Sequence, residues 1–580
     1  MDPKTFFQSP QNTAHKHYEA LRAFFVEEMN AEDVAEMFGY TKGAIYSLTR
    51  DFGNFLKKSD KPVSRFFVES HPGPKQKEKM GDVDDFIIIL RKKYLSVSDI
   101  KSILDSQNQT VSETYIYKVI KREGFGRLPR RGKVAKIETT SSIPISAPKS
   151  ILHAEVSESF STSSIGIMCF IPYILKYGID QLIVKSQYPN TKSLPVLNSI
   201  LSFLALKLSN IRRYSADDVW CVDRGLGLFA GLNVLPKAAW FSSYSHRITR
   251  EMNLSFLKGL HKIWHQNGLL SDTANLDFVT VPYWGDDSHL ENNWSGTRHQ
   301  ALPSILAALA HDPDTGIITY GDTNIRHKNK DGVIIEFLDF YRESDEGDLK
   351  YLVFDSKFTT YENLRKLDDN GVKFITIRRR GKKIVDELEA LPKAQWKTIR
   401  VQSAGGKTRQ LKVMDEKIML RDYGKKVRQI AITGHGRIKP ALIITNDFDL
   451  KAEEVVRKYA RRWLVEKAIS EQTHFFHLNR VSSSMVIKVD FDFTMTILAH
   501  NLYRLFAADL EGYSHQSDIK IYEKFVLNSG NINLDEFDIK AVVRKKRHHP
   551  ALISAMKQYE RCRISWLNNR QLKIEVASNS

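Results

Sequence analysis

The sequence contains little cysteine. Its 580 residues include three, at Cys169, Cys221 and Cys562. These residues lie too far apart to match the paired spacing of zinc ligands, and they are too few for a disulfide-rich scaffold. The amino-terminal residues also lack the charged and then apolar pattern of a signal peptide. Both absences predict a protein of a reducing compartment, which we expect to be the cytoplasm.

Long hydrophobic runs are absent as well. The longest, IGIMCFIPYIL over residues 165–175, is followed closely by Lys176 and Asp180. A helix that crosses a bilayer needs about 20 consecutive apolar residues. We therefore expect this run to form a buried helix, and we expect no membrane partner.

Acidic residues are outnumbered by basic ones. The chain has 86 Lys and Arg against 68 Asp and Glu, which gives a formal net charge of +18. Such an excess favours a polyanionic partner, because each phosphate that a protein neutralises releases condensed counterions. Ribosomal and membrane-surface proteins are also basic, so charge alone does not choose among these classes. The length predicts several domains.

Residues 12–72 contain the pattern of a helix-turn-helix domain. The sequence predicts a short helix over residues 31–38 with Asn30 as its cap, and Gly39 can supply the turn. Thr41 is expected to cap the second helix. An ordinary helical hairpin is the alternative, but this spacing favours a DNA-binding domain.

The second helix of this domain is predicted to have an inner and an outer face. Ala44, Ile45 and Leu48 are expected to face inward. The opposite face would then lie in a major groove. The residues predicted to contact DNA are Lys42, Ser47 and Arg50.

A second helical unit is predicted over residues 73–136. One helix begins near Ser98, and another is capped by Ser112 and ends at Gly124. The second helix has a basic, aromatic face, and a basic arm that could follow DNA phosphates comes after it. A solvated linker is the alternative for this arm. The residues predicted to contact DNA here are Lys118, Lys121, Arg122, Arg130 and Arg131.

Composition predicts three further regions. Residues 137–163 are rich in Ser, Thr and Pro, which is typical of a flexible linker. Residues 164–262 show helical periodicity and are expected to form a helical module with no assigned chemistry. Residues 516–580 are expected to form a C-terminal helical region.

From residue 275 the pattern changes to alternating strands and helices. Three strand candidates are followed by alternating helices and strands, an order that predicts a mixed α/β sheet. A further stretch over residues 381–439 has short alternating runs and predicts a β-rich insertion. Trp396 in this insertion could stack on a DNA base, but a Trp in such a place is more often part of the core. The strands are expected at 276–284, 301–312, 316–322, 351–356, 372–380 and 441–446, and the helices at 333–344 and 361–371.

Three acidic residues occupy notable places in this pattern. Asp277 lies in the first strand, Asp355 ends the fourth, and Glu466 lies in the helical segment AEEVVRKYARRWLVEKAI. Helical spacing places Arg462 and Glu466 on one face with Tyr459. Carboxylates are the hard oxygen ligands that Mg²⁺ prefers, and two such ions about 3.5–4 Å apart can catalyse phosphoryl transfer. A surface ion pair is the alternative reading of Arg462 and Glu466.

Other charged residues are weaker candidates for a metal site or are expected to contact DNA. Asp286, Asp287 and Glu291 lie in turn-like sequence and predict a solvated loop, whereas Asp322 and Asp447 end strands and are second choices as ligands. A basic run follows the strand at 372–380, and it is expected to line a DNA surface. The residues of this run predicted to contact DNA are Arg378, Arg379 and Arg380.

The motif Y-x2-R-x3-E, formed by Tyr459, Arg462 and Glu466, resembles that of DDE-type insertion-sequence transposases. The segments LDFVTV, SGTRHQALPSILAALAHDPDTGIITYGD and VFDSKFTTYENLRKLDDNGVKFITIRRR strengthen the resemblance. Together they resemble an RNase H-like catalytic domain, with bounds expected at 263–515. In that family a Lys usually follows the Glu by seven residues, and this position is Thr473 here.

The resemblance implies a DNA transposase. Asp277, Asp355 and Glu466 would be the catalytic residues and would hold two Mg²⁺ ions, for which Mn²⁺ can substitute. Tyr459 and Arg462 would contact DNA. The partners would be double-stranded DNA, both transposon inverted-repeat ends and target DNA, and a second copy of the chain in a synaptic complex. The location would be the bacterial cytoplasm, at the nucleoid.

The fold class expected is therefore multidomain α+β. It comprises N-terminal helix-turn-helix units, a helical module, and an RNase H-like mixed α/β catalytic core with a β-rich insertion. Two other functions remain open at this point. One is a non-catalytic, transposase-derived DNA-binding regulator, and the other is a different RNase H-like nuclease such as a junction resolvase.

Overall fold

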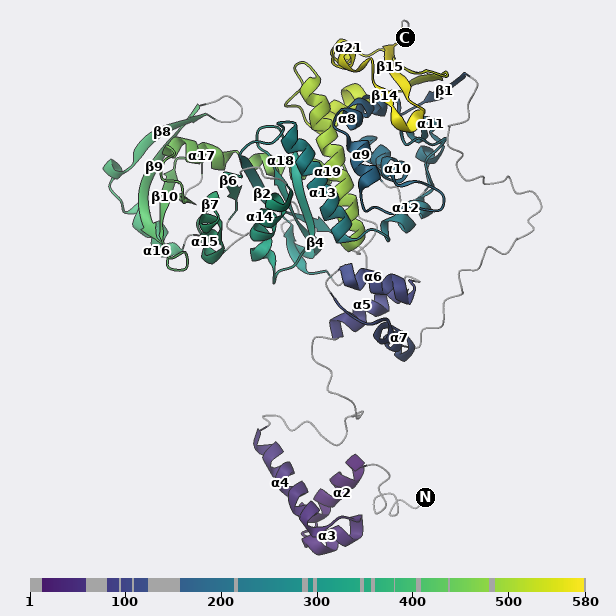
Figure 1. Ribbon diagram of the computed structural model, residues 1–580. Coiled ribbons are helices and arrows are strands. Elements are labelled where there is room, and N and C mark those ends of the chain that lie inside the picture. Colours follow the sequence, from purple (N-terminus) through teal and green to yellow (C-terminus); the bar gives the residue numbers. More distant parts are fainter. Residues whose placement is uncertain are drawn as a thin grey trace, which may run out of the picture. The chain divides into compact units, whose positions relative to one another are not determined.

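The computed structural model divides the chain into two compact units, Met1–Gly81 and Asp82–Ser580 (Figure 1). The structure describes residues 13–58, 81–92, 95–106, 109–123, 157–212, 217–283, 290–295, 300–344, 349–355, 360–379, 381–402, 408–436, 439–478 and 486–577.

The first unit contains the predicted pair of helices and one more. Helix α2 spans Thr13–Phe25, α3 spans Ala31–Phe38, and α4 spans Lys42–Lys58. The Asn30 side chain accepts hydrogen bonds from the first turn of α3, as expected of a cap. Gly39 ends α3 with a φ of 65°, a conformation that favours glycine.

The inner face of α4 differs from the prediction at one residue. Ile45 is buried and Leu48 is half-buried against α2 and α3, whereas Ala44 is exposed. The inward prediction for Ala44 is therefore wrong. Leu48 lies three residues from Ile45 and four from Ala44, so the buried face is centred on Ile45 and Ala44 lies at its exposed edge.

A three-helix cluster precedes the larger part of the second unit. Helix α5 spans Gly81–Lys92, α6 spans Val97–Ser106, and α7 spans Glu113–Arg122. The Ser112 side chain caps α7 by accepting from the Tyr115 N–H, as predicted. Asp84 of α5 holds α7 in place, because it accepts from the Tyr115 hydroxyl and, at 3.1 Å, from Arg122.

The predicted helical module is helical throughout most of its length. Among the described residues no single helix is long and apolar enough to cross a membrane; by length and composition alone, only the bent pair 165–176 and 179–185 passes that test. The elements are η2 (Ile165–Phe170), α8 (Ile171–Lys176), α9 (Ile179–Lys185), α10 (Val196–Leu208), η3 (Val219–Val222), α11 (Arg224–Phe229), α12 (Ala238–Ser245) and α13 (Arg250–Gln266).

A large mixed sheet follows, which confirms the predicted mixed α/β core. Within the described residues its strand order is β3-β4-β2-β6-β7-β11-β10-β9-β8, with β5 paired to β4. Its strands are β2 (Thr273–Pro282), β3 (Asn292–Ser295), β4 (Gln300–His311), β5 (Ile318–Ile325), β6 (Tyr351–Phe354), β7 (Lys373–Ile377), β8 (Lys397–Gln402), β9 (Thr408–Met419), β10 (Lys426–Thr433) and β11 (Ala441–Thr445).

The central strands of the sheet run in both directions. Strands β4 and β5 are antiparallel to each other, β4 is antiparallel to β2, and β2, β6 and β7 run parallel. Parallel strands need crossover connections, and helices supply them here. These helices are α14 (Val333–Ser344) between β5 and β6, and α15 (Tyr361–Asp369) between β6 and β7.

The predicted β-rich insertion extends this same sheet. It begins with α16 (Lys382–Glu389), and its strands β8, β9 and β10 pair in antiparallel order beyond β11 (Figure 1). Trp396 is half-buried against Leu388, Ala431 and Leu442, so it packs within the insertion.

The helix that carries Glu466 is interrupted, although the sequence predicts one continuous helix. Helix α17 spans Ala452–Ala460 and α18 spans Trp463–His474, with a turn between them. Both halves have helical periodicity, so the break leaves no pattern in the sequence. The break is stabilised by tertiary contacts of Arg461 with Asn275 and Pro313.

The prediction of a C-terminal helical region is wrong, because a five-stranded sheet dominates it. The order is β1-β12-β13-β15-β14. Strand β1 lies inside the predicted linker and pairs antiparallel with β12, so the end of that linker prediction is wrong too. The elements are β1 (Glu158–Thr162), α20 (Asp518–Ile521), η7 (Tyr522–Val526), β12 (Gly530–Leu534), β13 (Asp538–Val543), α21 (His549–Met556), β14 (Arg563–Ile564) and β15 (Arg570–Val576).

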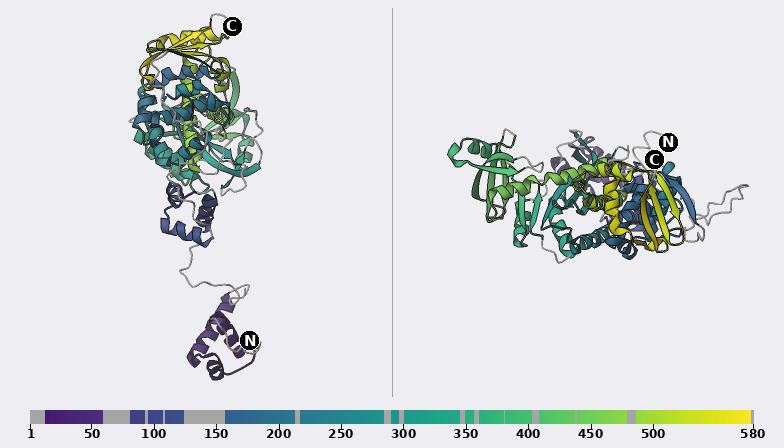
Figure 2. Two further views of the ribbon diagram at one scale, coloured as in Figure 1. Left: turned by 90° about the vertical axis from the view of Figure 1, so that its right-hand side faces the viewer. Right: turned by 90° about the horizontal axis from the view of Figure 1, so that it is seen from above.

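This sheet covers part of the helical module. Strand β1 contacts α11, and β12 and β13 contact η2. Figures 1 and 2 show the C-terminal strands in yellow against the blue helices of the module. Residues near 160 and residues 530–576 therefore form one body, although they are far apart in the sequence.

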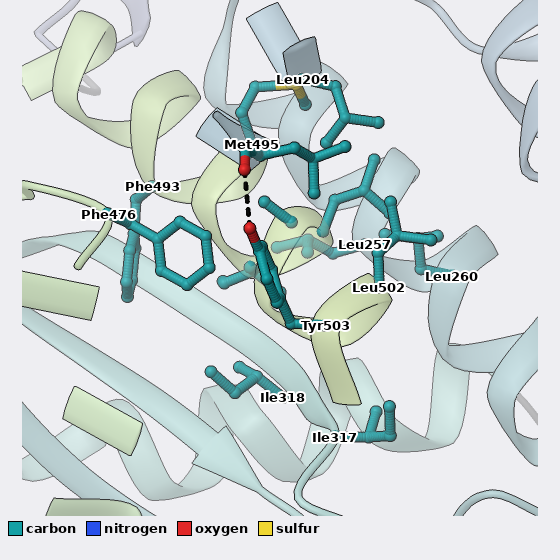
Figure 3. Close-up of a cluster of buried hydrophobic side chains, with 14 of the residues drawn as sticks. Leu204, Leu257, Leu260, Ile317, Ile318, Phe476, Phe493, Met495, Leu502 and Tyr503 are labelled. Carbon is teal, nitrogen blue, oxygen red and sulfur yellow. Dashed lines mark hydrogen bonds between the residues drawn. The ribbon is translucent and has the colours of Figure 1, made fainter. Parts of the chain in front are cut away.

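Helix α19 (Val486–Asp509) forms the centre of the main hydrophobic core. It packs against α10, α13 and β5. Figure 3 shows Tyr503 of α19 surrounded by buried side chains from these elements, with its hydroxyl donating to the Leu208 carbonyl at 2.6 Å. The helical module and the mixed sheet thus share one core.

A buried ion pair connects the module to the end of α18. The Lys207 Nζ lies 2.8 Å from the Asp492 carboxylate and 3.3 Å from the carbonyl oxygen of Phe476. Both side chains are almost fully buried. The lysine therefore joins α10, α19 and the segment that follows α18.

Replacing Lys207 with Met is expected to lower the free energy of unfolding by about 3–5 kcal/mol, because it leaves Asp492 charged, buried and without its partner amine. Urea-induced unfolding followed by tryptophan fluorescence measures this change. The double variant Lys207→Met with Asp492→Leu is expected to recover most of the loss. If the double variant loses as much free energy of unfolding as the single variant, the charge left on Asp492 is not the cause of the loss.

Candidate active site

Asp277 and Asp355 lie side by side on neighbouring parallel strands. Leu276 of β2 is in register with Phe354, the last residue of β6. The next residues along the two strands are Asp277 and Asp355. Because adjacent strands are about 4.8 Å apart, the sheet register places the two carboxylates next to each other.

Glu466 reaches the same place from α18 through Arg462. The Arg462 Nη1 donates to Asp277 Oδ2 at 2.5 Å, and its Nη2 donates to Glu466 Oε1 at 2.6 Å. The side chains of Arg462 and Asp277 are 15% and 16% exposed, whereas that of Glu466 is 56% exposed. One guanidinium therefore bridges a buried carboxylate and an exposed one.

Tyr459 completes the group from the end of α17. The guanidinium carbon of Arg462 lies 5.8 Å from the centre of the Tyr459 ring. Burial raises the pKa of Tyr459 to about 12. Its hydroxyl is therefore neutral at physiological pH, and it can donate a hydrogen bond to an anion.

Burial raises the pKa of Asp277. It is the largest cause, and the nearby charges of Glu466 and Asp355 raise the pKa further. Arg462 and the Phe278 N–H, which donates to Asp277 at 2.8 Å, act in the opposite direction. The net result is a pKa of about 6. Burial of the Asp277 carboxyl therefore outweighs its contact with Arg462.

The break between α17 and α18 is held by a residue that the sequence analysis missed. The fully buried Asn275 donates from Nδ2 to the Arg461 carbonyl at 3.1 Å. Arg461 also donates to the Pro313 carbonyl at 2.6 Å and pairs with Asp314. The signal in the sequence was a lone amide in an apolar strand, two residues before Asp277 and so on the same face.

The donor set fits a divalent cation such as Mg²⁺. Three carboxylates supply hard oxygen ligands, and they outnumber the one guanidinium, that of Arg462, which bridges two of them. Their ligand atoms do not yet gather closely. Within the described residues, only Glu471, His500 and Asp518 have ligand atoms that all lie within 4.8 Å of one another.

That second group is better explained as a structural ion network. His500 Nδ1 lies 2.6 Å from Asp518, and its Nε2 lies 3.0 Å from the Gly316 carbonyl oxygen, which can only accept. Arg504 also donates to Asp518. Both ring nitrogens of His500 face acceptors and a guanidinium is adjacent, so the imidazole has no free nitrogen to give a metal. It joins α18, α19 and α20.

Other acidic candidates are occupied in the core. Asp322 lies 3.4 Å from buried Arg250, and Asp447 accepts from the Tyr351 hydroxyl at 2.8 Å. The Thr473 hydroxyl, at the position of the usual family Lys, lies 3.1 Å from the Ile469 carbonyl oxygen. These contacts explain the side chains without a catalytic role.

The residues predicted to contact DNA are dispersed. Ser47, Lys118, Lys121 and Arg379 are exposed. Lys42, Arg50 and Arg122 pair with Glu32, Asp51 and Asp84, respectively. Arg378 is half-buried and donates to Gln429 at 2.6 Å, which joins β7 to β10. Arg130, Arg131 and Arg380 lie outside the described residues, as do Asp286 and Asp287.

Comparison with known protein families finds one domain in this chain. Residues 280–502 match the family described as "Transposase DDE domain", which confirms the resemblance found in the sequence. Asp355 and the Tyr459, Arg462 and Glu466 motif lie inside this span, and Asp277 lies just before it. No curated protein matches the chain.

One solved structure that matches is described as "Cryo-EM structure of piggyBac transposase synaptic complex with hairpin DNA (SNHP)". It has 12% sequence identity and a TM-score of 0.34, and the match covers 62% of this chain and 79% of that chain. A likeness of this size does not show a shared fold.

Replacing Asp277 with Asn is expected to stabilise the metal-free protein at pH 7.5. Because the folded-state pKa of about 6 lies above the ordinary aspartate value of 3.8, ionised Asp277 destabilises the fold above pH 6. The gain is at most about 3 kcal/mol, and it should shrink as the pH falls from 6 toward 4.

Chemical unfolding at pH 7.5 and 5.0 in the presence of a chelator measures this gain. Asp339→Asn, an exposed carboxyl on α14, is the matched control and should change little at either pH. A destabilised Asp277→Asn protein at pH 7.5 would show that the Arg462 contact outweighs burial.

Proposed function

We propose that this chain, which carries a transposase DDE domain over residues 280–502, is a DNA transposase that cuts transposon ends and joins them to target DNA. The observation that carries the proposal is the meeting of Asp277, Asp355 and Glu466. Two adjacent strands and a later helix bring these carboxylates to one place, around Arg462.

The alternatives explain this arrangement less well. A DNA-binding regulator without catalytic activity has no need for three carboxylates around a partly buried arginine, a group that raises the pKa of Asp277. Charged groups with perturbed pKa values cluster at functional sites. A different RNase H-like nuclease would have the same acids, but it rarely needs two helical units before its core.

The reaction divides among the residues as follows. Arg462 binds a phosphate of the DNA backbone with its planar guanidinium, and Tyr459 donates its hydroxyl to the same anion. Asp277, Asp355 and Glu466 would hold two Mg²⁺ ions, or Mn²⁺ in their place, which supply the positive charge that activates a water and stabilises the leaving 3′-oxygen. The freed 3′-hydroxyl then attacks target DNA in the same place, without a covalent bond to protein.

DNA ends are recognised outside this core. We assign that role to the helices of the first unit, through Lys42, Ser47 and Arg50, and to α7, through Lys118 and Lys121. Two DNA ends must be cut together, so the active form is a homodimer with both ends bound.

Replacing Asp355 with Ala is expected to reduce Mg²⁺-dependent cleavage of a transposon-end duplex by about 10²–10³-fold or more, the loss that follows removal of one electrostatic group from an active site. Binding of the duplex should stay near the wild-type level. Gel-based cleavage and fluorescence anisotropy measure the two quantities.

The matched control is Asp369→Ala, because Asp369 is an exposed carboxylate on α15 that pairs with Lys425. It should cleave like the wild type. If neither wild type nor control cleaves although both bind the duplex tightly, the chain is a regulator.

Removing the positive charges of Lys118 and Lys121 on α7 is expected to lower the affinity for the same duplex. It should also make that affinity less dependent on salt concentration. Each phosphate contact contributes about 0.9 to the slope of log K against log salt concentration. Lys118→Ala with Lys121→Ala should therefore reduce that slope by about 2.

The control removes a lysine that is already paired. Lys101 of α6 contacts Asp105 one turn away, so Lys101→Ala should leave the slope unchanged. Equal slopes for wild type and the double variant would remove α7 from the DNA interface.

A further inference from the structure

Arg462 occupies the oxygens that a divalent cation would need. Its two terminal nitrogens donate to Asp277 Oδ2 and Glu466 Oε1. A Mg²⁺ ion takes carboxylate oxygens at about 2.0–2.1 Å, so it would compete for these oxygens and lie next to a positive guanidinium. The contacts present in the free protein therefore oppose cation binding at the site.

The spacing of the three carboxylates also opposes cation binding in the free protein. Within the described residues the oxygens of Asp277, Asp355 and Glu466 do not form a group with all atoms inside 4.8 Å, although Glu471, His500 and Asp518 do. Glu466 is directed to the guanidinium, on an exposed side chain that can turn. Arg462 thus partly neutralises the site and occupies two of its carboxylates before any metal binds.

A phosphodiester can compete for the same guanidinium. Arginine presents a planar fork that binds phosphate through two parallel hydrogen bonds. Within the described residues the Nε–H of Arg462 is buried and makes no hydrogen bond, so it would gain a partner if the side chain turned to a phosphate. The Arg461 backbone is anchored by Asn275, so only the Arg462 side chain needs to move.

We propose that Arg462 is a reversible internal counter-ion that makes metal binding depend on DNA. In the free protein its guanidinium is hydrogen-bonded to Asp277 and Glu466, and it keeps a cation from binding their oxygens. When a DNA phosphate takes its guanidinium, both carboxylates are released to bind metal together with Asp355. This inference rests on the proposed function of the site, and it adds that DNA and metal bind with positive coupling.

A different role for Arg462 predicts the opposite change in metal affinity when the arginine is removed. If the arginine instead held the carboxylates in the arrangement that binds metal, its removal would weaken metal affinity. The sign of the change in Mn²⁺ affinity therefore separates the two roles, without any measurement of cleavage.

The experiment measures Mn²⁺ binding to the full chain at pH 8 by electron paramagnetic resonance of free Mn²⁺. Arg462→Gln is expected to bind Mn²⁺ at least about fivefold more tightly than the wild type, since coupling between sites is typically 5–150-fold. A saturating transposon-end duplex should raise the wild-type affinity similarly and leave that of Arg462→Gln unchanged.

Two further variants separate bridging from charge. Arg462→Lys keeps the positive charge but has no fork to span both carboxylates, so its affinity should lie between those of wild type and Arg462→Gln. Arg461→Gln removes the neighbouring cation, which pairs with Asp314, and should bind like the wild type. Thermal unfolding of each variant checks that it is folded.

The outcomes distinguish this inference from the proposed function. Mn²⁺ affinity that is unchanged or weaker in Arg462→Gln and Arg462→Lys, but is lost in Asp355→Ala, would overturn the counter-ion role and leave the catalytic site intact. Mn²⁺ binding that does not depend on Asp355 in any variant would overturn the site itself. An equal rise in Mn²⁺ affinity in Arg461→Gln and Arg462→Gln would mean that only net charge matters. It would overturn the role of Arg462 as a bridge between Asp277 and Glu466.

Discussion

The structure around the candidate site depends on the repulsion among three carboxylates that the fold forces together. Asp277 and Asp355 are adjacent because β2 and β6 are parallel and in register, and α18 adds Glu466. Like charges at such separations disfavour ionisation, which contributes to the raised pKa of Asp277. The group therefore requires positive charge, and Arg462 provides it within the protein itself.

The surrounding fold fixes the position of that charge from two sides. Asn275 binds the backbone of the break between α17 and α18, and so connects it to the strand of Asp277. The far end of α18 is held by Lys207 and by the network of His500 and Asp518. Rigid elements thus bracket a short helix that presents Glu466, and the side chain of Arg462 is the part that can change partners.

Much of the core was predictable from the sequence, because each strand has its own local pattern. Asp277 and Asp355 lie on the predicted strands, and Gly371 follows the predicted helix with a φ of 77°. Features that depend on distant partners were not predictable. The break before Trp463 needs Asn275, the C-terminal strands need β1 from the other end of the unit, and Arg378 is drawn to Gln429 on a later strand. Sequence periodicity cannot register such contacts.

Anomalous scattering from Mn²⁺, in crystals of the protein bound to a transposon-end duplex, would locate the metal ions directly. Manganese peaks are expected at Asp277, Asp355 and Glu466, with the Arg462 guanidinium on a DNA phosphate. Manganese at Glu471, His500 and Asp518, or an Arg462 that still bridges Asp277 and Glu466 beside a bound metal, would contradict this expectation.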